Sequence, residues 1–125
     1  MTNFQTPNSK KYDKDIYEWT YQFSLKVVKF TRKLPKSIEA DVIKKQLMRS
    51  ATSIAANLQE ADGSKTRQEF RHAVSISKKE AKETKLWLRM IADLYKVLSL
   101  EATDLISENE QIIKILSAIV INTKI

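Results

Sequence analysis

The scarcity of residues that interrupt helices constrains this chain more than any other feature. Only one glycine and two prolines occur among its 125 residues, and these two residue types are the ones that most often end helices. The single glycine, Gly63, lies between two long stretches that contain no other helix breaker. We therefore expect an all-α protein, folded as an antiparallel, up-and-down, left-handed four-helix bundle.

Apolar residues recur every three or four positions in four segments, which is the pattern of helices with one buried face. The spacing predicts helices over about 15–34, 38–61, 67–98 and 100–123. An apolar content of 42% beside 30% charged residues is typical of one soluble domain. We accordingly expect residues 1–12 to form a flexible tail and residues 13–125 to form a single bundle domain.

Local signals mark where several of these helices begin or end. Pro35 is expected to stop the first helix, and Ser37 is a suitable N-cap for the second. Gly63 suits the left-handed position that follows a helix, because it has no Cβ to clash. Thr66 and Glu69 fit a capping box, in which each side chain accepts a bond from the other residue's backbone N–H.

The second and third predicted helices carry distinct apolar faces. The face of the second helix is expected to hold Ile38, Val42, Leu47, Ala51, Ile54 and Leu58. The third helix has a seam with the four-three spacing of coiled-coil packing. That seam consists of Phe70, Val74, Ser77, Ala81, Thr84, Leu88, Ile91, Tyr95 and Leu98.

The fourth predicted helix is apolar over more than one face, which exceeds what a four-helix bundle needs to bury. A deeply buried helix and a subunit interface both account for the surplus. We favour the interface, because surplus apolar surface on a soluble protein tends to be hidden. On this hypothesis, Ile112, Ile115 and Ile119 contact another copy of the chain.

Composition excludes several classes of chemistry. The chain has no cysteine, so disulfides, thiolate metal ligands and a catalytic cysteine are ruled out. The N-terminal segment lacks the apolar core of a signal peptide, and no apolar run approaches the roughly 18 residues that cross a bilayer. We expect a soluble, unprocessed, cytoplasmic protein with no cofactor and no small-molecule substrate.

His72 is the only histidine, which limits both metal binding and catalysis. Glu69 and His72 match half of a di-iron bundle site, but such sites use two Glu-x-x-His helices. No glycine-flanked nucleophile elbow presents a serine to His72, so we expect neither a metal site nor an enzyme. Polar residues near the small-residue faces are instead expected to form an internal network that fixes helix register. These residues are Arg49, Asn57, Glu60, Glu80 and Glu83.

The net charge of +7 is unevenly distributed. Residues 1–92 hold 19 Lys and Arg against 10 Asp and Glu, whereas residues 93–125 hold 3 against 5. Helical spacing gathers part of the basic surplus into two stripes that suit the phosphates of RNA or DNA. A basic surface that serves only solubility is the alternative. The stripes are Lys26, Lys29 and Lys33 in the first helix, and Arg71, Lys78, Lys82, Lys85 and Arg89 in the third.

The residues on either side of Gly63 form a distinctive set, namely Arg49-Ser50-Ala51, Ser53-Ile54-Ala55, Asn57, Glu60, Gly63, Glu69-Phe70, Glu80-Ala81, Glu83-Thr84 and Trp87-Leu88. This set resembles the signature of a bacterial four-helix-bundle family. Members of this family include proteins encoded inside intervening sequences of 23S ribosomal RNA genes. The match departs from the family at residues 59–63, where many members have a shorter Ala-Glu-Gly, and at Met48, a frequently basic place.

The resemblance implies an up-and-down bundle that assembles into a homopentamer and has no enzymatic activity. Distant relatives act as basic accessory proteins to the reverse transcriptases of diversity-generating retroelements, so the resemblance also implies a nucleic-acid or nucleoprotein partner. The sequence therefore predicts a nonenzymatic bundle that binds RNA or DNA electrostatically through its two basic stripes. The alternative is a protein-interaction module.

Overall fold

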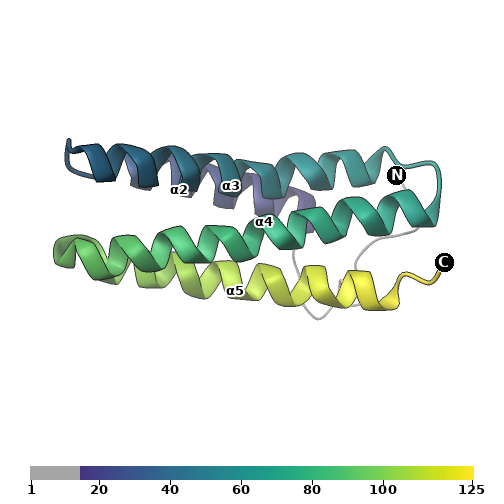
Figure 1. Ribbon diagram of the computed structural model, residues 1–125. Helices are drawn as coiled ribbons and strands as arrows, with labels where there is room; N and C mark the ends of the chain where they lie inside the picture. The colour runs from purple at the N-terminus through teal and green to yellow at the C-terminus, as the bar shows by residue number, and fades with distance from the viewer. Residues whose placement is uncertain (1–14) are drawn as a thin grey trace.

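The computed structural model describes residues 15–125, which form four long helices and one short 3₁₀ helix (Figure 1). The predicted tail at residues 1–12 lies outside this range. Successive long helices run in opposite directions, and the described residues contain no strand. The prediction of an all-α, antiparallel four-helix bundle is confirmed. The helices are α2 (Ile16–Thr31), α3 (Ile38–Asp62), α4 (Arg67–Leu94), η1 (Lys96–Leu98) and α5 (Ser99–Asn122).

Helix α4 holds the bundle together, because it packs against both α3 and α5, while α2 packs mainly against α3. The seam predicted for the third helix is buried at every position except Tyr95, which is half-buried. One contiguous core runs the length of the bundle. Its largest fully buried side chains include Phe23 and Phe30 on α2, Phe70 on α4, and Leu116 on α5.

Two helices end earlier than the sequence predicts. In α2, the backbone N–H groups of Lys33 and Leu34 donate three residues back, to Phe30 and Thr31, so the chain tightens into a turn before Pro35. A proline disfavours the helical conformation in the residue before it, here Leu34. Pro35 therefore accounts for the loss of the last predicted turn of α2. In α4, Tyr95 adopts an extended conformation and separates the helix from η1.

The caps of α3 and α4 match the sequence signals in part. The Ser37 hydroxyl accepts a bond from the Ala40 N–H at 3.2 Å, which confirms the predicted N-cap. The Thr66 hydroxyl accepts from the Glu69 N–H at 3.0 Å. The Glu69 carboxylate, however, accepts from the Lys65 N–H at 3.1 Å and not from that of Thr66. The predicted reciprocal capping box is therefore displaced by one residue.

The predicted apolar face of α3 is wrong in its first two turns. Ile38 is 85% exposed and Val42 is 55% exposed, whereas Ala40 and Ile43 are buried. A helix presents one face to its neighbours, and the residues that continue the buried face from Leu47 toward the N-terminus are Ile43 and Ala40. The side chains of Ile38 and Val42 therefore point away from the core.

Helix α5 supplies core residues at the positions that we expected to face another subunit. Ile112, Ile115 and Ile119 are all at most 2% exposed within the single chain. The prediction that these three residues form an oligomer interface is wrong, because they already contact the chain's own core. The alternative of a deeply buried helix accounts for them.

Small polar side chains in the core link neighbouring helices through backbone carbonyl groups. Ser24 on α2 donates to the carbonyl oxygen of Ala51 on α3 at 3.1 Å, and Ser77 on α4 donates to that of Ile54 at 2.8 Å. Asn109 on α5 donates to the carbonyl oxygen of Ala81 on α4 at 2.8 Å. Each pair of long helices that are consecutive along the chain thus shares a buried hydrogen bond that specifies its register.

Within residues 15–125, every helix is too short or too polar to span a lipid bilayer.

Gly63 ends α3 without the left-handed conformation that the sequence predicts, since its φ is −87° and its ψ is 5°. A Cβ added at this position would meet only the Glu60 carbonyl oxygen, at an ordinary contact distance of 3.7 Å. The turn is therefore compatible with any small L residue.

We expect Gly63→Ala to raise the free energy of unfolding by about 0.4–1 kcal/mol, because alanine restricts the unfolded chain at no steric cost in the folded one. Urea denaturation measures the change. Ser37→Ala is the control and should lower the same quantity by about 1 kcal/mol through the lost cap. A loss of stability in Gly63→Ala would mean that the turn needs a left-handed residue after all.

Candidate nucleic-acid interface

The basic stripe of α2 lies against carboxylates of α5. The ammonium group of Lys26 contacts the carboxylate of Glu108 at 2.9 Å, and that of Lys33 contacts Glu101 at 2.7 Å. Lys29 lines the same groove, of about 370 Å³, together with Asp104. Three cations here face three carboxylates, so the stripe predicted from α2 is not a free cationic surface.

Glu108 also orients a buried tryptophan, a contact that the sequence analysis missed. The indole N–H of Trp19 donates to Glu108 Oε2 at 2.8 Å, while Lys26 binds the other oxygen of the same carboxylate. The Glu108 side chain is only 20% exposed. One carboxylate thus fixes two α2 side chains on α5. The signal in the sequence was weak, because the two residues are 89 positions apart.

The basic stripe of α4 is much less neutralised. Lys85 pairs with Glu110 of α5 at 3.4 Å. Lys78, Lys82 and Arg89 form no ion pair within residues 15–125. Because Lys114 follows Glu110 by one helical turn, it lies beside the same stripe. We call this set the cationic strip; it comprises Lys78, Lys82, Lys85 and Arg89 of α4 and Lys114 of α5.

Arg71, which begins the predicted α4 stripe, serves a different purpose. Its Nε donates to the carbonyl oxygen of Val120 at 3.0 Å, near the end of α5. The last carbonyl groups of a helix lack partners within the helix, and a cation there also complements the helix dipole. Arg71 therefore caps α5, and we leave it out of the cationic strip.

The predicted internal polar network forms in part and lies nearer the surface than expected. The Arg49 guanidinium of α3 contacts the carboxylate of Glu80 at 3.2 Å and also that of Glu83, both on α4. Trp87 joins this group by donating its indole N–H to Glu83 at 3.0 Å. The Arg49 side chain is 47% exposed, so the network is a surface bridge between α3 and α4.

Asn57 and Glu60 lie outside this network, contrary to prediction. The Asn57 amide donates to the carbonyl oxygen of Ser53 on its own helix at 2.8 Å, and Glu60 is exposed. The carboxylate of Glu80 instead contacts Arg49. A fully buried amide that we did not predict, Asn109, instead provides a polar contact inside the core.

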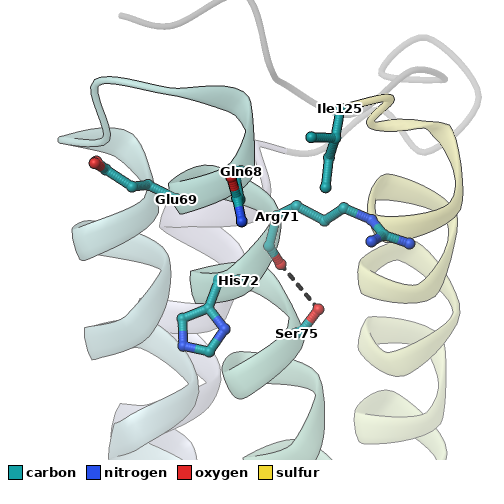
Figure 2. A pocket seen from close by; sticks show the side chains of 6 residues that line it. All are labelled: Gln68, Glu69, Arg71, His72, Ser75 and Ile125. Carbon is teal, nitrogen blue, oxygen red and sulfur yellow. Dashed lines mark hydrogen bonds between the residues drawn. The ribbon is translucent and has the colours of Figure 1, made fainter.

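The half-site for metal formed by Glu69 and His72 borders a pocket of about 460 Å³ at the end of α4 (Figure 2). Figure 2 shows Arg71 reaching toward α5 while His72 points away from it. The Glu69 carboxylate is engaged by the Lys65 N–H. Across residues 15–125, no three His, Cys, Asp or Glu side chains lie together as metal ligands would.

Tyr17 is the titratable group most altered by the fold. Burial, reinforced by the negative charges of Asp62 and Asp15, raises the pKa of Tyr17 to about 12. The phenol therefore remains protonated at neutral pH and is unsuited to act as a base. Its place is at the end of the bundle, away from the cationic strip.

Comparison with known proteins identifies the family. The family model for the 23S rRNA-intervening sequence protein matches residues 12–118. The chain belongs to this family. It is also similar to a protein of unknown function from the S23 ribosomal protein family of Bacteroides thetaiotaomicron VPI-5482, with 27% identity, a TM-score of 0.78, and coverage of 86% of this chain and 96% of that chain. No curated protein matches the chain.

Some of the residues that resemble the 23S rRNA-intervening sequence family are brought together by the fold. Arg49 comes from the matching part of α3, whereas Glu83 and Trp87 come from the matching part of α4. In the structure these three side chains form one hydrogen-bonded group. The residues that carry the family resemblance thus include a bridge between the two longest helices of the bundle.

We expect Arg49→Gln to lower the free energy of unfolding by about 1–2 kcal/mol, because it leaves the carboxylates of Glu80 and Glu83 without their shared counter-charge. Solvent screening of the half-exposed guanidinium keeps the cost below that of a buried pair. Chemical denaturation measures the difference. Lys33→Gln, which removes a more exposed pair, should cost less than about 0.5 kcal/mol. Equal costs for the two variants would show that the bridge adds no more stability than an exposed pair.

Proposed function

We propose that this member of the 23S rRNA-intervening sequence family is a nonenzymatic nucleic-acid-binding protein that contacts RNA or DNA through the cationic strip. The observation that carries the proposal is the row of cations on α4 that α5 leaves mostly unpaired, namely Lys78, Lys82 and Arg89. Such a row attracts phosphates and releases their counterions on binding. Of the two basic stripes predicted from the sequence, the proposal keeps the one on α4 and drops the one on α2.

The family's name supports a nucleic-acid context, because it refers to intervening sequences of 23S rRNA. The family resemblance adds a second kind of partner, a nucleoprotein such as a reverse transcriptase, whose nucleic acid would carry the same negative charge. Both partners would be met in the cytoplasm. A nonenzymatic role is supported by the only histidine. His72 is exposed, and the neighbouring Glu69 carboxylate accepts a hydrogen bond from the Lys65 N–H, so the two do not form a catalytic pair.

A protein-interaction function is favoured by a different surface, on the outer face of α3 and α4. Arg49 opposite Glu83 fixes the register of these antiparallel helices. Val42 lies two turns before Arg49, and Met90 lies two turns after Glu83, on the same face. One further turn along each helix reaches two more apolar residues. We call this set the apolar strip; it comprises Ile38, Val42, Met90 and Leu94.

The apolar strip is a better candidate for self-association than the isoleucines of α5. Leu94 is 54% exposed, and Ile38 and Val42 are more exposed still. Trp87 and Arg49 adjoin the strip, and tryptophan, methionine and arginine are enriched in protein interfaces. We propose a second copy of the chain as the occupant, within a homo-oligomer for which the family resemblance implies five subunits.

We expect the triple variant Lys78→Gln, Lys82→Gln, Arg89→Gln to bind nucleic acid at least about tenfold more weakly, and to reduce the slope of log affinity against log salt by about two to three units. The physical reason is the loss of three phosphate contacts. Fluorescence anisotropy titrations at several salt concentrations measure both quantities.

The charge-matched control is Lys26→Gln, Lys29→Gln, Lys33→Gln, which removes the same charge from the neutralised groove of α2 and should change affinity by less than about threefold. Glu110→Gln should increase affinity by roughly threefold, because it removes the carboxylate that pairs with Lys85. Equal losses for the two triple variants would show that only net charge matters and would contradict the proposed surface.

We expect Val42→Asp with Leu94→Asp to convert the oligomer into monomers, because charged groups on the apolar strip would be desolvated at the contact. Light scattering of the purified protein over a range of concentrations measures the mass. Ile121→Asp is the control, since Ile121 is 74% exposed on α5, outside the strip. A wild-type protein that is monomeric throughout, or an oligomer that survives the double substitution, would overturn this assignment.

A further inference from the structure

We propose that the cationic strip recognises the phosphate backbone of a double helix and discriminates against single strands. This inference rests on the proposed nucleic-acid-binding function and adds to it the class of nucleic acid. Three features of the structure carry it: the setting of α4 in the bundle, the straightness of the row of cations, and the place of the aromatic side chains.

Helix α4 is embedded between α3 and α5, which pack against it on both sides. A single helix of about 10–12 Å diameter fills the major groove of B-form DNA, which is about 12 Å wide. Because α5 borders the strip at the contact between Lys85 and Glu110, the surface presented there is two helices wide and too broad to enter that groove. The lysines and arginine of the strip can therefore reach phosphates but not base edges.

The four α4 cations form a straight row along a rigid support. They recur at spacings of four, three and four residues, so the row from Lys78 to Arg89 is about 16 Å long at a rise of about 1.5 Å per residue. Over any length of axis, a duplex presents roughly twice as many phosphates as one of its strands. A duplex is also stiff on this scale, so it meets a straight row without the ordering that a flexible strand requires.

Single-strand binding proteins offset that ordering by stacking bases on aromatic side chains. Within residues 15–125, five aromatic side chains belong to α2, which does not contact α4, and Tyr95 lies beyond the end of α4. Phe23, Phe30 and Phe70 are buried in the core. Trp87 points toward Glu83 and the α3 side of α4, opposite the side that carries Lys85 and its α5 partner. The strip therefore offers charge without a stacking platform.

The experiment compares probes that carry equal numbers of phosphates: a DNA duplex and an RNA duplex of about 20 base pairs, and an oligo-dT strand of about 40 nucleotides. The full chain is titrated into each labelled probe, and anisotropy is followed between about 50 and 200 mM salt. We expect both duplexes to bind at least about tenfold more tightly than oligo-dT. We also expect the two duplexes to agree within about threefold, since the contacts are to phosphates alone.

The outcomes separate this inference from the function on which it rests. If oligo-dT binds as tightly as the duplexes, and the Lys78, Lys82, Arg89 triple variant still loses affinity, the strip binds nucleic acid but the preference for a double helix is overturned. If one duplex is favoured by more than about tenfold, recognition extends beyond the phosphates, which overturns the backbone-only contact. If no probe binds at the lowest salt, the proposed function fails together with the inference.

Discussion

Small side chains at the contact between α3 and α4 set the register on which the rest of the bundle depends. Ser50 and Thr84 share a buried hydrogen bond of 2.9 Å, and Ser77 reaches the backbone of α3 directly. Short side chains let the two helices approach closely, and the hydrogen bonds allow only one alignment. That alignment places Arg49 opposite Glu83 and, farther along, turns the apolar strip outward.

Helix α5 determines which cations of the two predicted basic stripes are paired. Its carboxylates occupy the side that faces α2, where Glu101 and Glu108 pair with lysines. The side that faces α4 supplies one such partner, Glu110. Within residues 15–125, the lysines at the seam between α2 and α5 are therefore more neutralised than those at the seam between α4 and α5.

The sequence predicted the number of helices, the fold class and the seam of α4, because helical periodicity and scarce helix breakers are local properties. It did not predict which cations are neutralised. Lys26 and Glu108 are separated by 82 positions, and only packing brings them together. The error at Ile38 and Val42 has a related origin. Two overlapping apolar periodicities begin α3, and the packing of α3 against α2 and α4 selects the one that contains Ile43.

Isoleucine and glutamate alternate on the side of α5 that faces α4. This alternation explains why most cations of the cationic strip have no carboxylate partner on α5. Ile106 and Ile113 flank Glu110 by four and three positions, and both are half-buried against the core. Apolar side chains at these levels fill the seam with α4 without offering a counter-charge to Lys78, Lys82 or Arg89. The same positions occupied by glutamate would reproduce the neutralised groove of α2. The identity of Ile106 and Ile113 is thus as important for the charge of this surface as the cations themselves.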